Sequence, residues 1–224
     1  MTQATLIELI EQHHPLMSHA EIRLKLNNAQ DDFCAKTELI KGTYRQLTTA
    51  GKRYYTLDDE IIRILKVQLD DIVIPRLLNP PIIDDDEFDG EAGRNDANVG
   101  STEFAWYVDS KRIGIVEHIS QGLTIGSSTT YYQSISTTGK ELRLFTIAQA
   151  DDFTTNTALS SDLPNQFHEA LSFKVIADGY LRGESLKPDI SQLFEGKYMM
   201  MVKEGKKFAK SNYTYDGRII PQDF

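Results

Sequence analysis

Residues 163–171 read Leu163-Pro164-Asn165-Gln166-Phe167-His168-Glu169-Ala170-Leu171, and this stretch decides the fold. Pro164 suits the first turn of a helix, and Asp162 just before it is a fair cap. The apolar residues recur at helical spacing: Phe167, Ala170, Leu171 and Val175. A helix with one apolar face needs a partner that buries this face, and the N-terminal segment of the chain supplies one.

The N-terminal segment contains two predicted helix starts. Thr5 with Glu8 and Ser18 with Glu21 have capping-box spacing, and Pro15 separates the two helices. The second helix places its apolar residues on one face, continues through Leu39 and Ile40 and stops at Gly42: Ile22, Leu26, Ala29 and Phe33. We expect these helices to pack against the one that follows Pro164.

A final helix is predicted to begin near Pro188. Lysines gather towards its end, where positive charge favours the helix dipole. Its apolar side holds Ile190, Leu193, Phe194, Met201 and Phe208. Helical segments at both ends of the chain, each with one apolar face, predict a helical bundle.

Strand patterns fill the middle of the chain. Tyr, Thr, Ile and Val dominate residues 43–48, 54–57 and 61–69, and Ala50-Gly51-Lys52 predicts a hairpin between the first two runs. Further runs cover residues 104–108, 112–116, 123–125, 129–135 and 141–147. The expected fold class is α+β, with a helical core in residues 1–57 and 151–211, an inserted antiparallel β-rich domain in residues 58–150, and an extended arm in residues 212–224.

Composition excludes several classes of protein. The 224 residues carry a net charge of −9, which argues against wrapping by nucleic acid, because that binding needs lysine and arginine. Apolar runs fall far short of the roughly 20 residues that span a bilayer, and no signal-peptide pattern opens the chain, so we expect no membrane contact and synthesis in a cytoplasm. The single cysteine, Cys34, excludes an intramolecular disulfide and predicts a packed thiol.

An acidic loop follows Pro80-Pro81. Part of it fits the alternating pattern of a calcium loop: Asp85, Glu87, Asp89, Gly90 and Asp96. Glutamate at the third place and aspartate at the twelfth depart from that pattern, so we expect a solvated loop and no metal. The loop acids of interest are Asp84, Asp85, Asp86, Glu87 and Asp89.

No motif predicts an enzyme or a cofactor. His13 and His14 are adjacent and do not point the same way on a helix, which argues against a metal pair. The segment from Gly122 to Gly126 lacks the lysine of a phosphate loop. His118 beside Glu117, and His168 beside Glu169, are sequence neighbours that rarely face one reacting atom, so no catalytic residue is predicted.

The C-terminal tail is rich in apolar and aromatic residues for a segment beyond the last helix. They are Tyr213, Tyr215, Ile219, Ile220 and Phe224. Disordered ends are poor in these types, so the tail predicts an arm that adds to the surface of another subunit.

Three N-terminal segments follow one another: Thr5-Leu6-Ile7-Glu8-Leu9-Ile10, Ser18-His19-Ala20-Glu21 and Gly42-Thr43-Tyr44-Arg45-Gln46-Leu47. Residues 163–171 form the matching helical segment towards the other end of the chain. Together the two ends resemble the head-to-tail adaptor (connector, or head completion) proteins of tailed bacteriophages, while the middle matches weakly. The resemblance implies a helical core formed by Leu6, Leu9, Ile22, Leu26, Phe33, Phe167, Leu171 and Val175.

The resemblance also implies a role. Such adaptors are virion structural proteins that form a homo-oligomeric ring of about a dozen copies, a dodecamer, beneath the portal protein and join the capsid vertex to the tail. The arm would reach the portal, and the β insertion would face the next tail or neck protein. An acidic ring would let DNA pass through the channel without specific binding, with the loop acids from Asp84 to Asp89 as candidates for the lumen.

Two other readings remain open. A tail-tube or tail-completion protein would stack its β domain on a tube. Alternatively, aromatic residues in the β region would fit a receptor-binding or carbohydrate-binding module: Trp106, Tyr107, Tyr131 and Tyr132.

Overall fold

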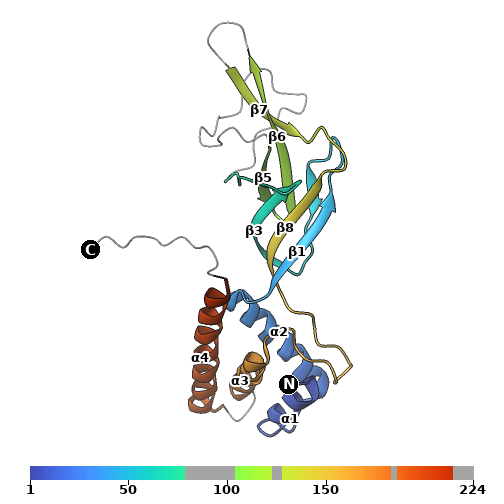
Figure 1. Ribbon diagram of the computed structural model, residues 1–224. Coiled ribbons are helices and arrows are strands. Elements are labelled where there is room, and N and C mark those ends of the chain that lie inside the picture. Colours follow the sequence, from blue (N-terminus) through green and yellow to red (C-terminus); the bar gives the residue numbers. More distant parts are fainter. Residues whose placement is uncertain (79–103, 123–127, 183–185, 214–224) are drawn as a thin grey trace, which may run out of the picture. The chain divides into compact units, whose positions relative to one another are not determined.

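The computed structural model describes residues 1–78, 104–122, 128–182 and 186–213. Over these described residues the fold class is α+β, with four α-helices and two antiparallel sheets. The chain divides into two compact units (Figure 1). The helical unit comprises residues 1–41 together with the chain from residue 147 onwards, and the β unit comprises residues 42–146.

The expected boundaries at residues 57/58 and 150/151 therefore need correction. Strands β1 (Lys41–Leu47) and β2 (Tyr54–Thr56) lie before residue 57, but their backbones pair with strands of the β unit. Hydrogen bonds between strands hold these residues in the sheets, so they cannot belong to the helical core.

The helical unit contains α1 (Gln3–Glu11), α2 (His19–Thr37), the 3-10 turn η1 (Asn165–Phe167), α3 (His168–Tyr180) and α4 (Pro188–Tyr213). Helix α3 contacts α1, α2 and α4 and lies among them (Figure 1). The stretch that opens α3 is thus the centre of this core. Seven of the eight predicted core residues are buried: Leu6, Ile22, Leu26, Phe33, Phe167, Leu171 and Val175.

Several details of the helices differ from expectation. Leu9 is only half-buried, and Ile7 and Ile10 of α1 fill the core instead. On α4, Leu193 is 59% exposed, whereas Tyr198 and Val202 are buried. Which face of a helix is buried depends on how the neighbouring helices approach it, and the period of the sequence alone does not specify this approach.

The helix ends were predicted with mixed success. Ser18 caps α2 as expected, because its Oγ accepts a hydrogen bond from the Glu21 N–H at 3.2 Å. Helix α1 is capped by Thr2 rather than Thr5. Helix α2 stops at Thr37 and does not reach Ile40, since Glu38 adopts the left-handed conformation with φ 55°. Asp162 does not cap α3, as its carboxylate accepts a bond from the Asp151 N–H.

The β unit holds two sheets with the strand orders β1-β8-β3-β4 and β2-β6-β5, and β7 pairs with β6. The remaining strands are β3 (Ile61–Leu69), β4 (Ile72–Ile74), β5 (Phe104–Asp109), β6 (Arg112–Gly122), β7 (Ser128–Ser134) and β8 (Glu141–Ala148). The predicted hairpin at Ala50-Gly51-Lys52 is wrong, because β1 and β2 lie in different sheets. Gly51, at φ 75°, donates its N–H to Ile135 O as the chain passes between them.

Strand β4 was not predicted, because a run of three residues is shorter than the usual strand pattern. Its signal was the pair Asp70-Asp71, whose positive φ values of 48° and 64° make the tight two-residue turn of a β-hairpin. After Ile74 the chain joins the sheets, since Trp106 N donates to Pro75 O and Leu77 N donates to Trp106 O. Within the described residues, no helix is long and apolar enough to span a membrane.

Candidate functional site

Most of the predicted binding residues fall outside the part of the chain that the structure describes. This holds for Asp84, Asp85, Asp86, Glu87 and Asp89, for Gly90 and Asp96 of the calcium pattern, and for Tyr215, Ile219, Ile220 and Phe224. Helix α4 extends to Tyr213, so residues 212 and 213, which were assigned to the arm, belong to this helix.

The histidines of the helical unit have separate structural partners. His13 Nδ1 lies 3.1 Å from Tyr180 Oη, and His14 Nε2 lies 3.1 Å from Ile176 O. Burial, together with the nearby His14 and Lys197, lowers the pKa of His13. The two rings thus fasten the end of α1 to α3, and the described residues contain no cluster of three metal-ligating side chains.

The two predicted histidine–glutamate neighbours are also held apart. His168 is buried, with Nε2 2.6 Å from Leu163 O and Nδ1 3.1 Å from Met1 O, while Glu169 is exposed. Glu117 accepts a hydrogen bond from the Ser136 N–H, and His118 packs edge-on against Tyr132. Neither pair converges on a common point.

Cys34 is confirmed as a packed thiol. It is fully buried, and burial raises its pKa to about 11. Trp106 and Tyr107 are 3% and 1% exposed, so these two aromatic residues belong to the core of the β unit. They do not form the exposed platform on which a sugar would stack.

Helix α4 has a solvent-exposed face that no other described element buries. We call it the α4 face: Leu193, Gly196, Met200, Lys203 and Lys207, which recur at helical spacing. Leu193 and Met200 are 59% and 62% exposed. This surface is apolar at one end and carries two lysines at the other, beside the exposed Glu204.

Helix α2 exposes a second face, and its one charged side chain, Asp31, is a half-buried acid. The α2 face comprises Ala20, Leu24, Asn28, Asp31 and Ala35, and Leu24 is 62% exposed. Burial, and then the neighbouring Asp152 carboxylate, raise the pKa of Asp31. A cation placed beside these two carboxylates would relieve the repulsion between their like charges.

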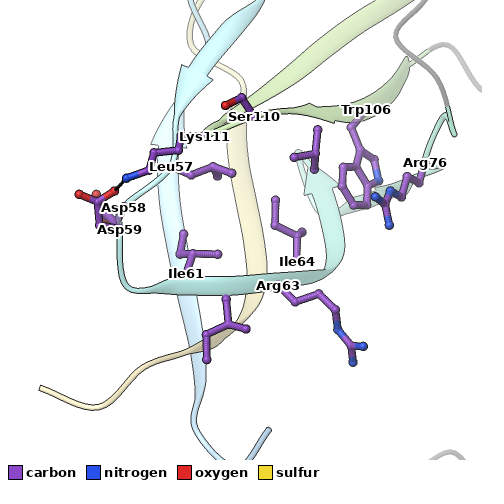
Figure 2. A pocket seen from close by; sticks show the side chains of 12 residues that line it. Leu57, Asp58, Asp59, Ile61, Arg63, Ile64, Arg76, Trp106, Ser110 and Lys111 are labelled. Atoms are coloured by element: carbon purple, nitrogen blue, oxygen red, sulfur yellow. Dashed lines mark hydrogen bonds and ion pairs between the residues drawn. The ribbon is translucent and has the colours of Figure 1, made fainter. Parts of the chain in front are cut away.

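The β unit contains a pocket of about 250 Å³ (Figure 2). It opens because β4 pairs only with Val67–Leu69 and then turns away to Trp106, leaving the first half of β3 uncovered on this side. Its floor is apolar: Leu57, Ile61, Ile64, Trp106 and Val108.

Charged residues stand at the two ends of this pocket. Asp58 and Asp59 lie at one end, where Asp59 pairs with Lys111. Arg76 lies at the other end, beside Trp106, as Figure 2 shows. The guanidinium carbon of Arg76 is 5.3 Å from the centre of the Trp106 ring. This pocket was not predicted from the sequence, because the residues that line it come from segments that are far apart along the chain.

Comparison with known proteins adds no assignment. No protein-family model matches this chain, and a search of the curated proteins finds no match.

Proposed function

We propose that this chain is a virion structural protein of a tailed bacteriophage, a head-to-tail adaptor that forms a ring beneath the portal. The ring joins the capsid vertex to the tail and continues the DNA channel. In this proposal the helices form a bundle, the β unit is an insertion into it, and the residues after α4 are an extended arm. The role is mechanical and requires neither catalysis nor a cofactor.

One observation carries the proposal: the helical unit exposes two different faces, one that carries two lysines and one that carries the acid Asp31. Such faces fit a head-to-tail contact, in which the α4 face of one copy meets the α2 face of the next. Contacts of this kind form a ring when the rotation between copies closes, and an open filament when it does not. Leu193 and Met200 would bury apolar surface against Leu24, worth about 1.5–3 kcal/mol for each fully buried side chain. Lys203 and Lys207 would approach the Asp31 and Asp152 carboxylates.

The charge of the chain supports the same role. A net charge of −9 on each copy, repeated around a ring, gives a field that repels the DNA phosphates, so the genome passes without specific binding. The acids from Asp84 to Asp89 are proposed to contribute to this field in the lumen.

The proposal assigns one partner to the arm and another to the β unit. The arm, with Tyr215, Ile219, Ile220 and Phe224, would bind the portal protein, and the β unit would meet the next tail or neck protein. The assembled protein would reside in the neck of the virion.

The ring contact is tested by exchanging charges across it. The double variant K203E/K207E and the double variant D31K/D152K should each abolish rings in negative-stain electron microscopy, and a protein carrying all four changes should recover them. K66E, a charge reversal in the β unit, is the matched control and should leave rings intact. Rings that survive either double variant would contradict this contact.

The portal contact is tested by mixing the protein with the portal ring from the same genome. The full chain should add a ring below the portal, and a chain ending at Tyr213, which keeps all of α4, should not. Equal binding of both chains would remove the role of the arm. Stacking into long tubes without the portal would favour the tail-tube alternative.

A further inference from the structure

We propose that the pocket of the β unit binds an extended peptide segment of a partner protein. The segment places a branched aliphatic side chain between Ile61 and Val108 and a carboxylate on Arg76. This inference stands apart from the adaptor role, because it depends only on the residues of the β unit.

The size and lining of the pocket favour a side chain over a metabolite. Its volume of about 250 Å³ is below the roughly 300–1,000 Å³ of sites that enclose drug-sized ligands. Ile61 and Ile64 project from β3 towards the space in front of Trp106 (Figure 2). These aliphatic walls offer hydrophobic contact, and burial of one aliphatic side chain there would contribute about 1.5–3 kcal/mol.

Arg76 supplies the polar recognition. Its side chain is exposed, yet its guanidinium is held over the Trp106 ring by a cation–π contact. Within the described part of the chain, no carboxylate lies within ion-pair distance of Arg76. A planar guanidinium that is already oriented and can still form an ion pair is suited to bidentate binding of a carboxylate.

The opposite end of the pocket sets the direction of the segment. Asp58 and Asp59 are exposed acids, and Lys111 forms an ion pair with Asp59. An acidic residue of the ligand is therefore attracted to the Arg76 end and repelled from the Asp58 end. A glycan is disfavoured, because Trp106 is 3% exposed and Arg76 covers its ring.

Trp106 is the only tryptophan of the protein, so its fluorescence reports on the pocket. The probe is the peptide acetyl-Gly-Ile-Ser-Asp-Ser-Gly-amide, titrated into the full-length protein; its isoleucine and aspartate are two positions apart and therefore lie on the same face of an extended segment. We expect a saturable change in fluorescence, with shifts of the Ile61 and Ile64 methyl signals in NMR spectra. The same peptide with asparagine in place of aspartate should bind about tenfold more weakly.

Two variants locate the binding. R76Q should weaken binding of the aspartate peptide about tenfold and abolish its preference over the asparagine peptide. R112Q removes another exposed arginine of the β unit, one that stacks on Tyr54, and should bind as the unchanged protein does. The methyl signals provide the comparison, since R76Q alters the surroundings of Trp106 directly.

Three results would overturn the inference. One is the absence of methyl shifts with either peptide up to about 10 mM. Another is equal affinity of R76Q and the unchanged protein for the aspartate peptide. The third is a stronger response to chitotetraose than to the peptide, which would make the pocket a glycan site.

Discussion

The approach of α2 to α4 at Gly205 offers a sharp test of the helical packing. Gly205 is buried, and a methyl group in place of its hydrogen would lie 2.8 Å from Thr37 Cγ2 and 3.2 Å from Phe33 Cζ. Thr37 is held in place because its hydroxyl donates to Phe33 O at 2.7 Å, and Phe33 is fully buried. The variant G205A should therefore force the two helices apart.

The magnitude is the balance of two opposing effects. Overpacking of a tight core contact costs about 1–3 kcal/mol, while replacing glycine by alanine inside a helix returns about 1 kcal/mol. G196A, in the same helix, is the matched control, because Gly196 is exposed and its added methyl meets no atom within 4 Å. Both variants share the gain in helix propensity, so the difference between them isolates the contact at about 1–3 kcal/mol.

The assay is urea unfolding followed by two signals. Far-ultraviolet circular dichroism reports mainly on the helices, and the fluorescence of Trp106 reports on the β unit. G196A should raise the free energy of unfolding from the dichroism signal, and G205A should lower it or leave it near that of the unchanged protein. The reasoning would be refuted if G205A matched or exceeded G196A in stability.

Three further predictions concern other buried groups. Burial raises the pKa of Cys34 to about 11, above its unfolded value of about 8.5, so the unfolded state loses the thiol proton first and the free energy of unfolding falls as pH rises through this range. In urea unfolding at several pH values, C34A should show a shallower fall of this free energy with pH. Equal slopes for C34A and the unchanged protein would contradict the assignment. H168A removes the ring that bonds to Leu163 O and should lower the free energy of unfolding by about 2–4 kcal/mol. The control E169A changes the exposed neighbour and should lower it by about 0.5 kcal/mol or less. Similar losses in the two variants would show that the His168 ring does not support the core. G114A would make a methyl group overlap Cζ and Oη at the end of the buried Tyr107 side chain. It should destabilise the β unit by about 2–3 kcal/mol in the fluorescence transition alone, and an unchanged transition would disprove the close contact.

The sequence by itself determined the local elements. The helical spacing of Ile22, Leu26 and Phe33 and the cap at Ser18 predicted α2, and residues 61–69 predicted β3 with its bounds. These features succeed because a hydrophobic period and a cap depend on residues within a few positions of one another. Cys34 was placed correctly for the same reason.

Only the tertiary structure decided how those elements meet. The sequence around Gly51 predicts a hairpin that would pair β1 with β2, the strand that contains Tyr55. In the structure β2 pairs with β6 instead, because strand pairing is set by contacts between segments distant in sequence. The same holds for the pocket, where Ile61, Arg76 and Trp106 come together only once β4 turns towards β5. A periodic pattern states which side of an element is apolar, whereas the partner that covers it, or leaves it open, is fixed by the packing of the whole unit.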